Sequence, residues 1–429
     1  MVKMDVVVEG RVLLDKGLTD CCIGIENGRI IKIAKTVGKA DKRYDFNGRI
    51  VMPAGIDLHV HFREPGMTNK EDFTTGSTAA ACGGVSFVLD MPNTRPPTRT
   101  VTDIKDKLSM VSRKSFVDFG LAALLDSESD VEKLANEATA FKIYLGETTG
   151  GLGIDPQELG DSISRAGDKP VFVHAEHLGK LNEIIEKDLL GHDQRRSKGL
   201  ELEAVEKVIS AKNEKSKIHL LHVTQTEILE LARSSRITTE VTPHHLLMNC
   251  SDAKPLGTRG KINPPLRSND TQQSLWTSFV SGIATTLGSD HSPHTLAEKE
   301  VEFDAAPSGM PGVETLMPLM LQKVAERKLD VSMLSEYCSL NPAGICGLKK
   351  GKIEIGYDAD LIVVDLRGTR IRRRIRADDL HSKCGWTPYE GMEAVFPLAT
   401  FLRGEEIARE GELSGDRTGM HIRPGREDQ

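Results

Sequence analysis

Eight apolar, strand-like segments alternate with helix-like stretches through the middle of this chain, and this alternation constrains the fold more than any other feature. The expected strands are residues 55–58, 85–89, 119–124, 141–145, 170–173, 218–221, 237–241 and 283–287. The expected helices include residues 70–82, 155–166, 200–211, 226–233, 271–281 and 313–327. Strands that are apolar throughout are typical of a parallel sheet covered by helices. Eight strand–helix units predict an α/β fold, the (β/α)8 TIM barrel.

Both ends of the chain have a different, β-rich pattern. Short β-branched runs fill the first 52 residues, where Asn27-Gly28 and Asn47-Gly48 are expected hairpin turns. β character returns at residues 352–356 and 359–365. Neither end has enough apolar surface to fold alone. We therefore expect residues 1–52 and 349–429 to form one composite β-sandwich domain, and residues 53–348 to form the barrel, which would be the catalytic domain.

Composition excludes several classes of function. The formal charge is -7 and no basic stripe is present, which argues against nucleic-acid binding. The one basic cluster, residues 370–376, is expected to be a solvated edge strand or interdomain surface. No run of 18 apolar residues predicts a membrane span, and the first residues lack a signal-peptide pattern. Seven cysteines without a CxxC pair indicate reduced thiols and a cytoplasmic protein.

Potential metal ligands stand at the carboxyl ends of five expected strands. Active sites of barrels are built at this face, so these side chains are expected to converge. His59 and His61 lie two residues apart on an extended segment and point to the same side. A single histidine after a strand is more often structural, but independent accidents would rarely place ligands at equivalent depth on several strands. The set predicts two divalent metals with room for water, as in a hydrolase: His59, His61, Lys142, His174, His222 and Asp290.

Lys142 is unusual because it lies inside an apolar strand, where a buried ammonium is costly. It could simply pair with a buried carboxylate. Burial beside metal cations would instead favour the neutral amine, which can add carbon dioxide and become a carbamate anion. Two zinc ions with this carbamate, Asp290 and a bridging hydroxide leave a net charge of +1, which suits an anionic substrate.

Five motifs together resemble the dihydroorotases, class I type, of the amidohydrolase superfamily. They are His59-Val60-His61-Phe62-Arg63-Glu64-Pro65-Gly66, Met91-Pro92-Asn93-Thr94, Phe141-Lys142-Ile143-Tyr144, His174-Ala175-Glu176 and Ser289-Asp290-His291-Ser292-Pro293-His294. The resemblance covers nearly the whole chain. It implies two Zn²⁺ ions per subunit, one held by His59, His61 and Asp290. The other would be held by His174 and His222, with carboxylated Lys142 bridging both ions.

The resemblance also implies a reaction, the reversible cyclisation of N-carbamoyl-L-aspartate to L-dihydroorotate with loss of water in pyrimidine biosynthesis. A zinc-activated bridging hydroxide would attack the ring amide in the hydrolytic direction, with Asp290 as general acid and base. The planar guanidinium of Arg63 suits a carboxylate. Considered alone, Arg63 could instead form an ion pair at the rim of the site. The implied substrate contacts are Arg63, Asn93 and His294 on the carboxylate, and Asn263, Ser308 and Gly309 near the ring.

Several alternatives stay open at this point. Allantoinases share the ligand set but typically have cysteine at the position of His294. Hydantoinases and dihydropyrimidinases act on substrates without the carboxylate. A non-catalytic scaffold for aspartate transcarbamoylase would be expected to lack metal ligands. Leu221 stands where some relatives have a cysteine associated with a third metal, so a third zinc is not expected. His244 and His245 are expected to orient a loop, and the sequence leaves open a homodimer or a transcarbamoylase partner.

Overall fold

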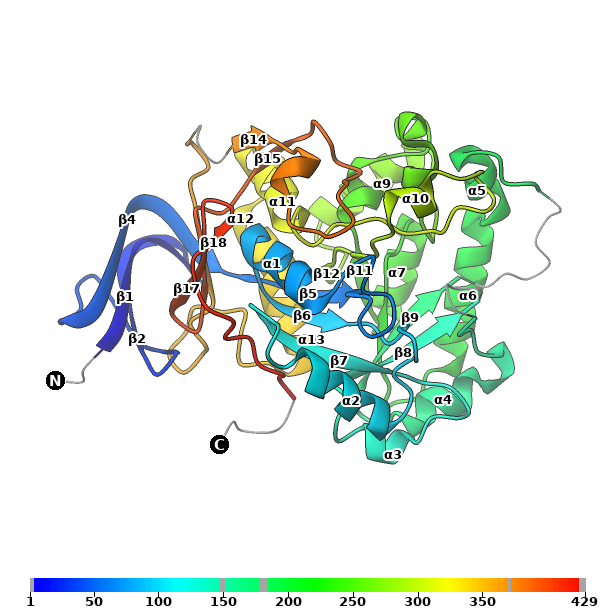
Figure 1. Cartoon of the computed structure of the whole chain (residues 1–429), viewed down its shortest axis with the longest axis horizontal. Helices are drawn as coiled ribbons and strands as arrows, with labels where there is room; N and C mark the ends of the chain where they lie inside the picture. The colour runs from blue at the N-terminus through cyan, green and yellow to red at the C-terminus, as the bar shows by residue number, and fades with distance from the viewer. Residues whose placement is uncertain (1–3, 147–150, 177–183, 369–371, 424–429) are drawn as a thin grey trace.

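The computed structural model describes residues 4–146, 151–176, 184–368 and 372–423, and its centre is a parallel eight-stranded barrel (Figure 1). Neighbours in the barrel follow sequence order: β5 (Gly55–Val60), β6 (Val85–Asp90), β7 (Asp118–Leu124), β8 (Ala140–Leu145), β9 (Pro170–Ala175), β10 (Lys217–Leu220), β11 (Thr238–Val241) and β12 (Thr286–Leu287). The first and last strands meet just beyond their ends, where the His61 N–H donates to the His291 carbonyl at 2.8 Å. The predicted barrel is confirmed.

Helices cover the outside of the barrel. They are α1 (Phe73–Gly83), α2 (Val101–Val111), α3 (Val131–Leu134), α4 (Leu159–Arg165), α5 (Leu189–Arg195), α6 (Lys198–Ala211), α7 (Thr226–Ser234), α8 (Pro243–Leu247), α9 (Asn269–Val280), α10 (Leu296–Lys299), α11 (Leu316–Ala325), α12 (Val331–Ser335) and α13 (Asn341–Cys346). Short turns η1 (Pro156–Glu158), η2 (Lys254–Gly260), η3 (Glu336–Leu340) and η4 (Ala377–Asp379) connect them. Within the described ranges, no helix has the length and apolar character that crossing a bilayer needs.

Two expected elements are shorter than the sequence suggested, and local hydrogen bonds explain why. The helix expected at residues 70–82 begins at Phe73, because the Asp72 side chain caps it by accepting the Thr75 N–H. Lys70 therefore lies in the preceding loop. The strand expected at 283–287 is reduced to β12, because the Ile283 N–H donates to Ser278 O at the end of α9.

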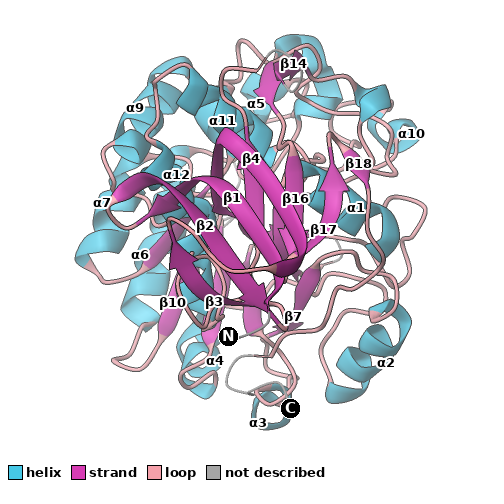
Figure 2. Ribbon diagram, turned by 90° about the vertical axis from the view of Figure 1, so that its left-hand side faces the viewer, coloured by secondary structure: helices cyan, strands magenta, loops and turns pink. Residues whose placement is uncertain are grey.

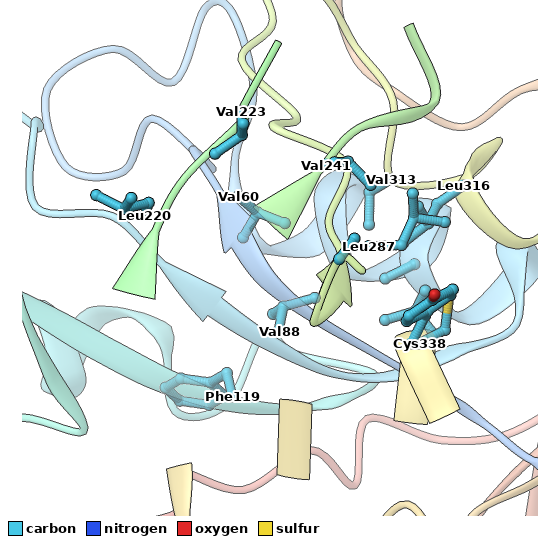
Figure 3. Packing of buried hydrophobic residues seen from close by; sticks show 14 of the residues in the cluster. Val60, Val88, Phe119, Leu220, Val223, Val241, Leu287, Val313, Leu316 and Cys338 are labelled. Atoms are coloured by element: carbon cyan, nitrogen blue, oxygen red, sulfur yellow. The ribbon is translucent and has the colours of Figure 1, made fainter. Parts of the chain in front are cut away.

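Alternating side chains of the barrel strands fill two separate apolar layers. Phe87 and Leu89 belong to a cluster of the barrel interior, whereas Val88 packs in the larger cluster between the strands and the helices. Figure 3 shows Val88 and Leu287 in this larger cluster, to which Leu316 of α11 also belongs. Because both faces are covered, the strands are apolar throughout, as the sequence indicated.

Strands from both chain ends form one further eight-stranded sheet beside the barrel (Figure 2), which confirms a small β domain drawn from both termini. Its order is β18 (Glu412–Leu413), β17 (Glu405–Arg409), β16 (Ala399–Leu402), β13 (Leu361–Val364), β4 (Ala40–Pro53), β1 (Met4–Leu14), β2 (Gly17–Glu26) and β3 (Arg29–Ala34). Met52 and Ile362 pack in the barrel-side core, while Val51 and Leu361 pack in a second core. The domain boundaries at 52/53 and 348/349 stay a prediction.

The two expected hairpin turns have different outcomes. Asn27 and Gly28 have positive φ angles and join β2 to β3, as predicted. Gly48 instead lies inside β4, which pairs with β1 on both sides of a bulge, so the expected hairpin at Asn47-Gly48 is wrong. Long-range parallel pairing with β1 determines the local conformation here.

Two other expectations concern the C-terminal part, and one of them is wrong. The segment 352–356 is a turn region and not a strand; Gly356 contributes one hydrogen bond to Ile30. The arginine-rich run forms the short strand β14 (Arg372–Arg374), paired with β15 (Glu393–Val395) in a separate two-stranded sheet, and Arg372 is exposed. Arg370 and Ile371 lie outside the described residues.

Buried Lys350 connects the two sheets. Its Nζ lies 2.7 Å from Asp118 of β7, 2.8 Å from Asp360 and 3.0 Å from Asp358, beside β13. Arg403 also pairs with Asp118. Burial disfavours charge, but the three carboxylates outweigh it and hold the pKa of Lys350 above its ordinary value. This ammonium and the Arg403 guanidinium therefore link the barrel electrostatically to the terminal sheet.

We expect Lys350→Met to destabilise the fold by about 3 kcal/mol, because it leaves buried carboxylates with too little positive charge. The midpoint of urea unfolding measures the effect. Lys352→Met is the matched control, since Lys352 pairs with Asp15 and Glu354 at a partly exposed surface. Equal midpoints for the two variants would contradict the role given to Lys350.

Candidate metal centre

The predicted ligands converge at the carboxyl end of the barrel. His59 lies in β5 and His61 follows it, Lys142 lies in β8, and His174 in β9. His222 and Asp290 lie in the segments after β10 and β12. We call these six side chains the ligand cluster. Five strands thus deliver potential ligands to one place, as expected from a barrel.

Distances within the ligand cluster are short. Asp290 Oδ1 lies 3.3 Å from His59 Nε2 and 3.3 Å from His61 Nε2. His174 Nδ1 and His222 Nε2 are 2.8 Å apart. Ligand atoms of His59, His222 and Asp290 lie within 4.8 Å of one another, a group that can hold a metal ion.

One cavity contains nearly the whole predicted site. Its empty space, counted out to the open solvent at its mouth, is about 420 Å³. Of the predicted site residues only His294 is not in its lining, and His294 contacts two lining residues, Arg63 and Ser308. The cavity is lined by His59, His61, Arg63, Asn93, Lys142, Tyr144, His174, His222, Asn263, Asp290, Ser292, Ser308 and Gly309.

Burial favours the neutral form of three histidines of this cavity. Desolvation holds the pKa values of His59, His61 and His222 well below the ordinary value, and neighbouring positive groups add to the effect. A neutral imidazole has the free lone pair that a metal ligand needs. These three histidines therefore have the protonation state required for metal binding.

Three ligand histidines have an amide or carboxylate oxygen beside one of their ring nitrogens. His59 Nδ1 lies 2.8 Å from Glu240 Oε1, and His61 Nδ1 lies 2.6 Å from Asn93 Oδ1. His174 Nε2 lies 3.4 Å from the Glu176 carboxylate. Such outer partners orient metal-binding imidazoles and raise their basicity.

Charge and hydrogen bonding also fit a bound cation. Burial raises the pKa of Glu240 well above its ordinary value, and Asp57 and Asp290 raise it further. A divalent ion nearby would reverse this by favouring the carboxylates. Among the described residues, Lys142 Nζ and His222 Nδ1 have no hydrogen-bond partner although both are buried. The residues present therefore suit a metal cation, which supplies positive charge and accepts lone pairs from its ligands.

Burial shifts Lys142 toward the uncharged amine. Desolvation lowers its pKa to about 7, even though Asp290 and Glu240 favour the ammonium. Its Nζ lies 4.7 Å from the centre of the Tyr144 ring. Among the described residues, Lys142 forms no ion pair. The alternative, a lysine paired with a buried carboxylate, is therefore wrong for this part of the chain.

Three residues at this site have a strained backbone conformation. Arg63, His222 and Asp290 have positive φ angles of 61°, 39° and 44°. Residues other than glycine rarely adopt this region, and such strain persists only where the surroundings impose it. At Gly309, φ is 137° and an added Cβ would lie 2.5 Å from Ser292 O, so glycine is required in this wall of the cavity.

Several residues of the site were not found from the sequence. Glu240 gave a usable signal, because a carboxylate inside an apolar strand needs the same explanation as Lys142. Tyr144 lies two residues after Lys142 on β8, so its side chain shares the inward face. His245 behaves as expected for a loop-orienting residue, since its Nε2 lies 3.0 Å from Pro264 O, next to Asn263. His244 is buried against the His245 ring, and neither of its ring nitrogens has a hydrogen-bond partner among the described residues.

We expect Glu240→Gln to weaken metal binding about 10- to 100-fold, because the amide cannot supply the charge that orients His59. Competition with a chromogenic chelator measures the affinity. Glu230→Gln, on the exposed face of α7, is the control and should leave the affinity unchanged. Equal affinities for both variants would rule out the orienting role of Glu240.

Comparison with known proteins agrees with this site. Residues 50–401 match the model of the Amidohydrolase family. A dihydroorotase of Methanosarcina acetivorans is 40% identical, over 94% of this chain and 92% of its own. A dihydroorotase of Pyrococcus furiosus is 37% identical, over 98% and 96%. The solved L-hydantoinase (dihydropyrimidinase) of Arthrobacter aurescens is 27% identical with a TM-score of 0.91, covering 98% of this chain and 100% of its own. The chain belongs to the dihydroorotase family of the amidohydrolases.

Proposed function

We propose that this protein is a metal-dependent dihydroorotase, which interconverts N-carbamoyl-L-aspartate and L-dihydroorotate with the loss or uptake of water. The observation that carries the proposal is the place of Arg63, a buried cation at the wall of the cavity that contains the ligand cluster. Full-length relatives at 40% identity that are named dihydroorotase support the same reaction. The reaction is a step of pyrimidine biosynthesis.

The proposed cofactor is a pair of zinc ions. His59, His61 and Asp290 would hold one ion, and His174 and His222 the other. Carboxylated Lys142 would be shared by both, a modification supported by the burial of its amine and by a pKa of about 7. When bound, the ions would supply an activated water and polarise the ring carbonyl. Glu240 and Glu176 would hold the rings of His59 and His174 in the orientation that metal binding needs.

Asp290 is the proposed proton carrier. In the hydrolytic direction, its carboxylate takes the proton of the attacking water and returns it to the departing ring nitrogen. In the synthetic direction, Asp290 takes the proton of the attacking nitrogen and gives it to the departing hydroxide, which leaves as water. Its position supports this task, because Oδ1 lies 3.3 Å from two imidazoles at the mouth of the barrel.

Polar groups around the cavity match the functional groups of the substrate. Arg63 and His294 would bind the substrate carboxylate. Asn93 uses its Oδ1 for His61, which leaves its Nδ2 as a further donor for that carboxylate. Asn263 lines the cavity with a buried Oδ1 that has no partner among the described residues, so it can accept a ring N–H. Ser308 and Gly309 would border the ring.

The carboxylate contacts separate this proposal from its rivals. Hydantoin and allantoin lack the ring carboxylate, so binding them would leave the buried Arg63 without an anionic partner, which is unfavourable. The presence of all ligands argues against a scaffold without metal. We further propose a cytoplasmic location, because all seven cysteines are unpaired. A homodimer and an aspartate transcarbamoylase partner stay predictions.

A substrate comparison tests the function. Purified protein supplied with zinc and bicarbonate should hydrolyse L-dihydroorotate, and should turn over hydantoin and allantoin at least ~100-fold less efficiently, as expected when a required hydrogen-bonding group is missing. Metal analysis of the same sample separates an enzyme from a scaffold. Preferred turnover of hydantoin or allantoin would overturn the proposal.

Asp290→Asn should lower kcat about 10²- to 10⁴-fold, because the amide cannot carry a proton between water and nitrogen. Far-UV circular dichroism and the thermal midpoint should stay close to those of the wild type. Asp378→Asn, at an exposed position, is the control and should retain full activity. Near-normal turnover by Asp290→Asn would remove Asp290 from the proposed mechanism.

A further inference from the structure

The ring of His294 has a neighbour on each nitrogen, and together they determine its tautomer. Nδ1 lies 3.1 Å from Lys70 Nζ, and Nε2 lies 3.2 Å from the Ser308 carbonyl oxygen. An ammonium can only donate, so Nδ1 must be the acceptor. A carbonyl oxygen can only accept, so Nε2 must carry the hydrogen. Both contacts require the same neutral Nε2–H form.

The environment keeps His294 neutral as well as oriented. The side chain is fully buried, and its pKa lies well below the ordinary value because of desolvation and the positive charges of Arg63, Lys70 and Lys299. A protonated ring would place its Nδ1–H 3.1 Å from the Lys70 ammonium, while the Glu298 carboxylate lies 3.7 Å from Nδ1, beyond hydrogen-bond distance. The geometry and the surrounding charge therefore agree on a neutral ring.

Lys70 is held firmly in its place behind His294. Its Nζ lies 2.7 Å from Glu298 Oε1, and only 12% of its side chain is exposed. Glu298 also accepts the Thr295 N–H at 3.0 Å, which closes the capping box of α10. The Lys70 ammonium is thus fixed relative to the segment that contains His294.

The tautomer has a consequence for Arg63, which lies in the same loop as Lys70. Arg63 Nη2 is 3.3 Å from His294 Nε2, but a nitrogen that carries a hydrogen in the ring plane cannot accept a hydrogen bond. Arg63 Nε donates to Pro293 O at 3.2 Å. In this structure the single Nε2–H points to the Ser308 carbonyl oxygen, so a substrate carboxylate would share this hydrogen with Ser308 or take it from that carbonyl. Arg63 and His294 would then form adjacent donors for the two oxygens of the carboxylate.

We propose that Lys70 is a positioning residue that selects the Nε2–H tautomer of His294 and so makes this site specific for a substrate with a ring carboxylate. The inference rests on the proposed function for its substrate, but the tautomer assignment does not depend on turnover. With Nδ1–H instead, the Nε2 lone pair would face the incoming carboxylate and repel it. Lys70 need not touch the substrate.

Three variants test this role. Lys70→Met keeps the length of the side chain but cannot donate, whereas Lys70→Arg retains a cationic donor. Lys383→Met is the matched control, because it removes an ammonium that pairs with Asp72, near Lys70, without a contact to His294. Thermal midpoints of all three verify that each variant is folded.

Nitrogen NMR of the metal-loaded protein with ring-¹⁵N histidine reads the tautomer directly, and His294→Gln assigns the signal. The wild type, Lys70→Arg and Lys383→Met should have a protonated Nε2 and an unprotonated Nδ1. Lys70→Met should lose this preference. Its KM for L-dihydroorotate should rise about tenfold with kcat nearly unchanged, as for the loss of one hydrogen bond to a charged group.

An unchanged His294 signal in Lys70→Met would overturn the tautomer assignment. A changed signal with an unchanged KM would overturn the role in specificity. A wild-type protein with no dihydroorotate turnover, but with the expected change of signal between variants, would refute the proposed function while supporting the assignment. Failure of the function and failure of the inference are therefore distinguishable.

Discussion

The structure depends on one electrostatic constraint, the crowding of buried imidazoles and carboxylates at the mouth of the barrel. Asp57, Glu240 and Asp290 lie in or beside the ligand cluster, and burial raises the pKa values of Asp57 and Glu240. Burial raises the pKa of Asp57 to about 6. Divalent cations would neutralise this group of acids and use the lone pairs of the neutral histidines. Metal binding and the stability of the barrel mouth are thus expected to be coupled.

The parts of the chain outside the barrel also hold the site in shape. The Trp386 indole N–H donates to His294 O at 2.7 Å, and Ser382 Oγ donates to Glu71 at 2.6 Å. Glu71 in turn lies 3.3 Å from His291, the neighbour of Asp290. A segment far along the chain therefore fixes both the proposed proton carrier and the proposed carboxylate-binding residue. This explains why the C-terminal segment cannot be regarded as an independent appendage of the barrel.

Much of this arrangement could be predicted from sequence because it follows from local patterns. His59, His61, His174 and Asp290 are of ligand type and stand at strand ends, so the barrel alone brings them together. Lys142 was identified by its conflict with an apolar strand. Glu240 presents the same conflict, because it is a carboxylate in an apolar strand. From the sequence we expected a role for the histidines after β11, but none for Glu240.

The remaining features depend on contacts between distant segments, which local patterns do not contain. Asn47-Gly48 resembles a hairpin turn, yet pairing of β4 with β1 on both sides makes it a bulge. The role of Lys70 depends on the approach of the loop after β5 to the segment after β12.

Crystals grown with zinc and bicarbonate, measured on both sides of the zinc absorption edge, test the central claim most directly. We predict two anomalous peaks within the ligand cluster and a carboxylate on Lys142 Nζ; a bare amine with no anomalous peak would contradict the account.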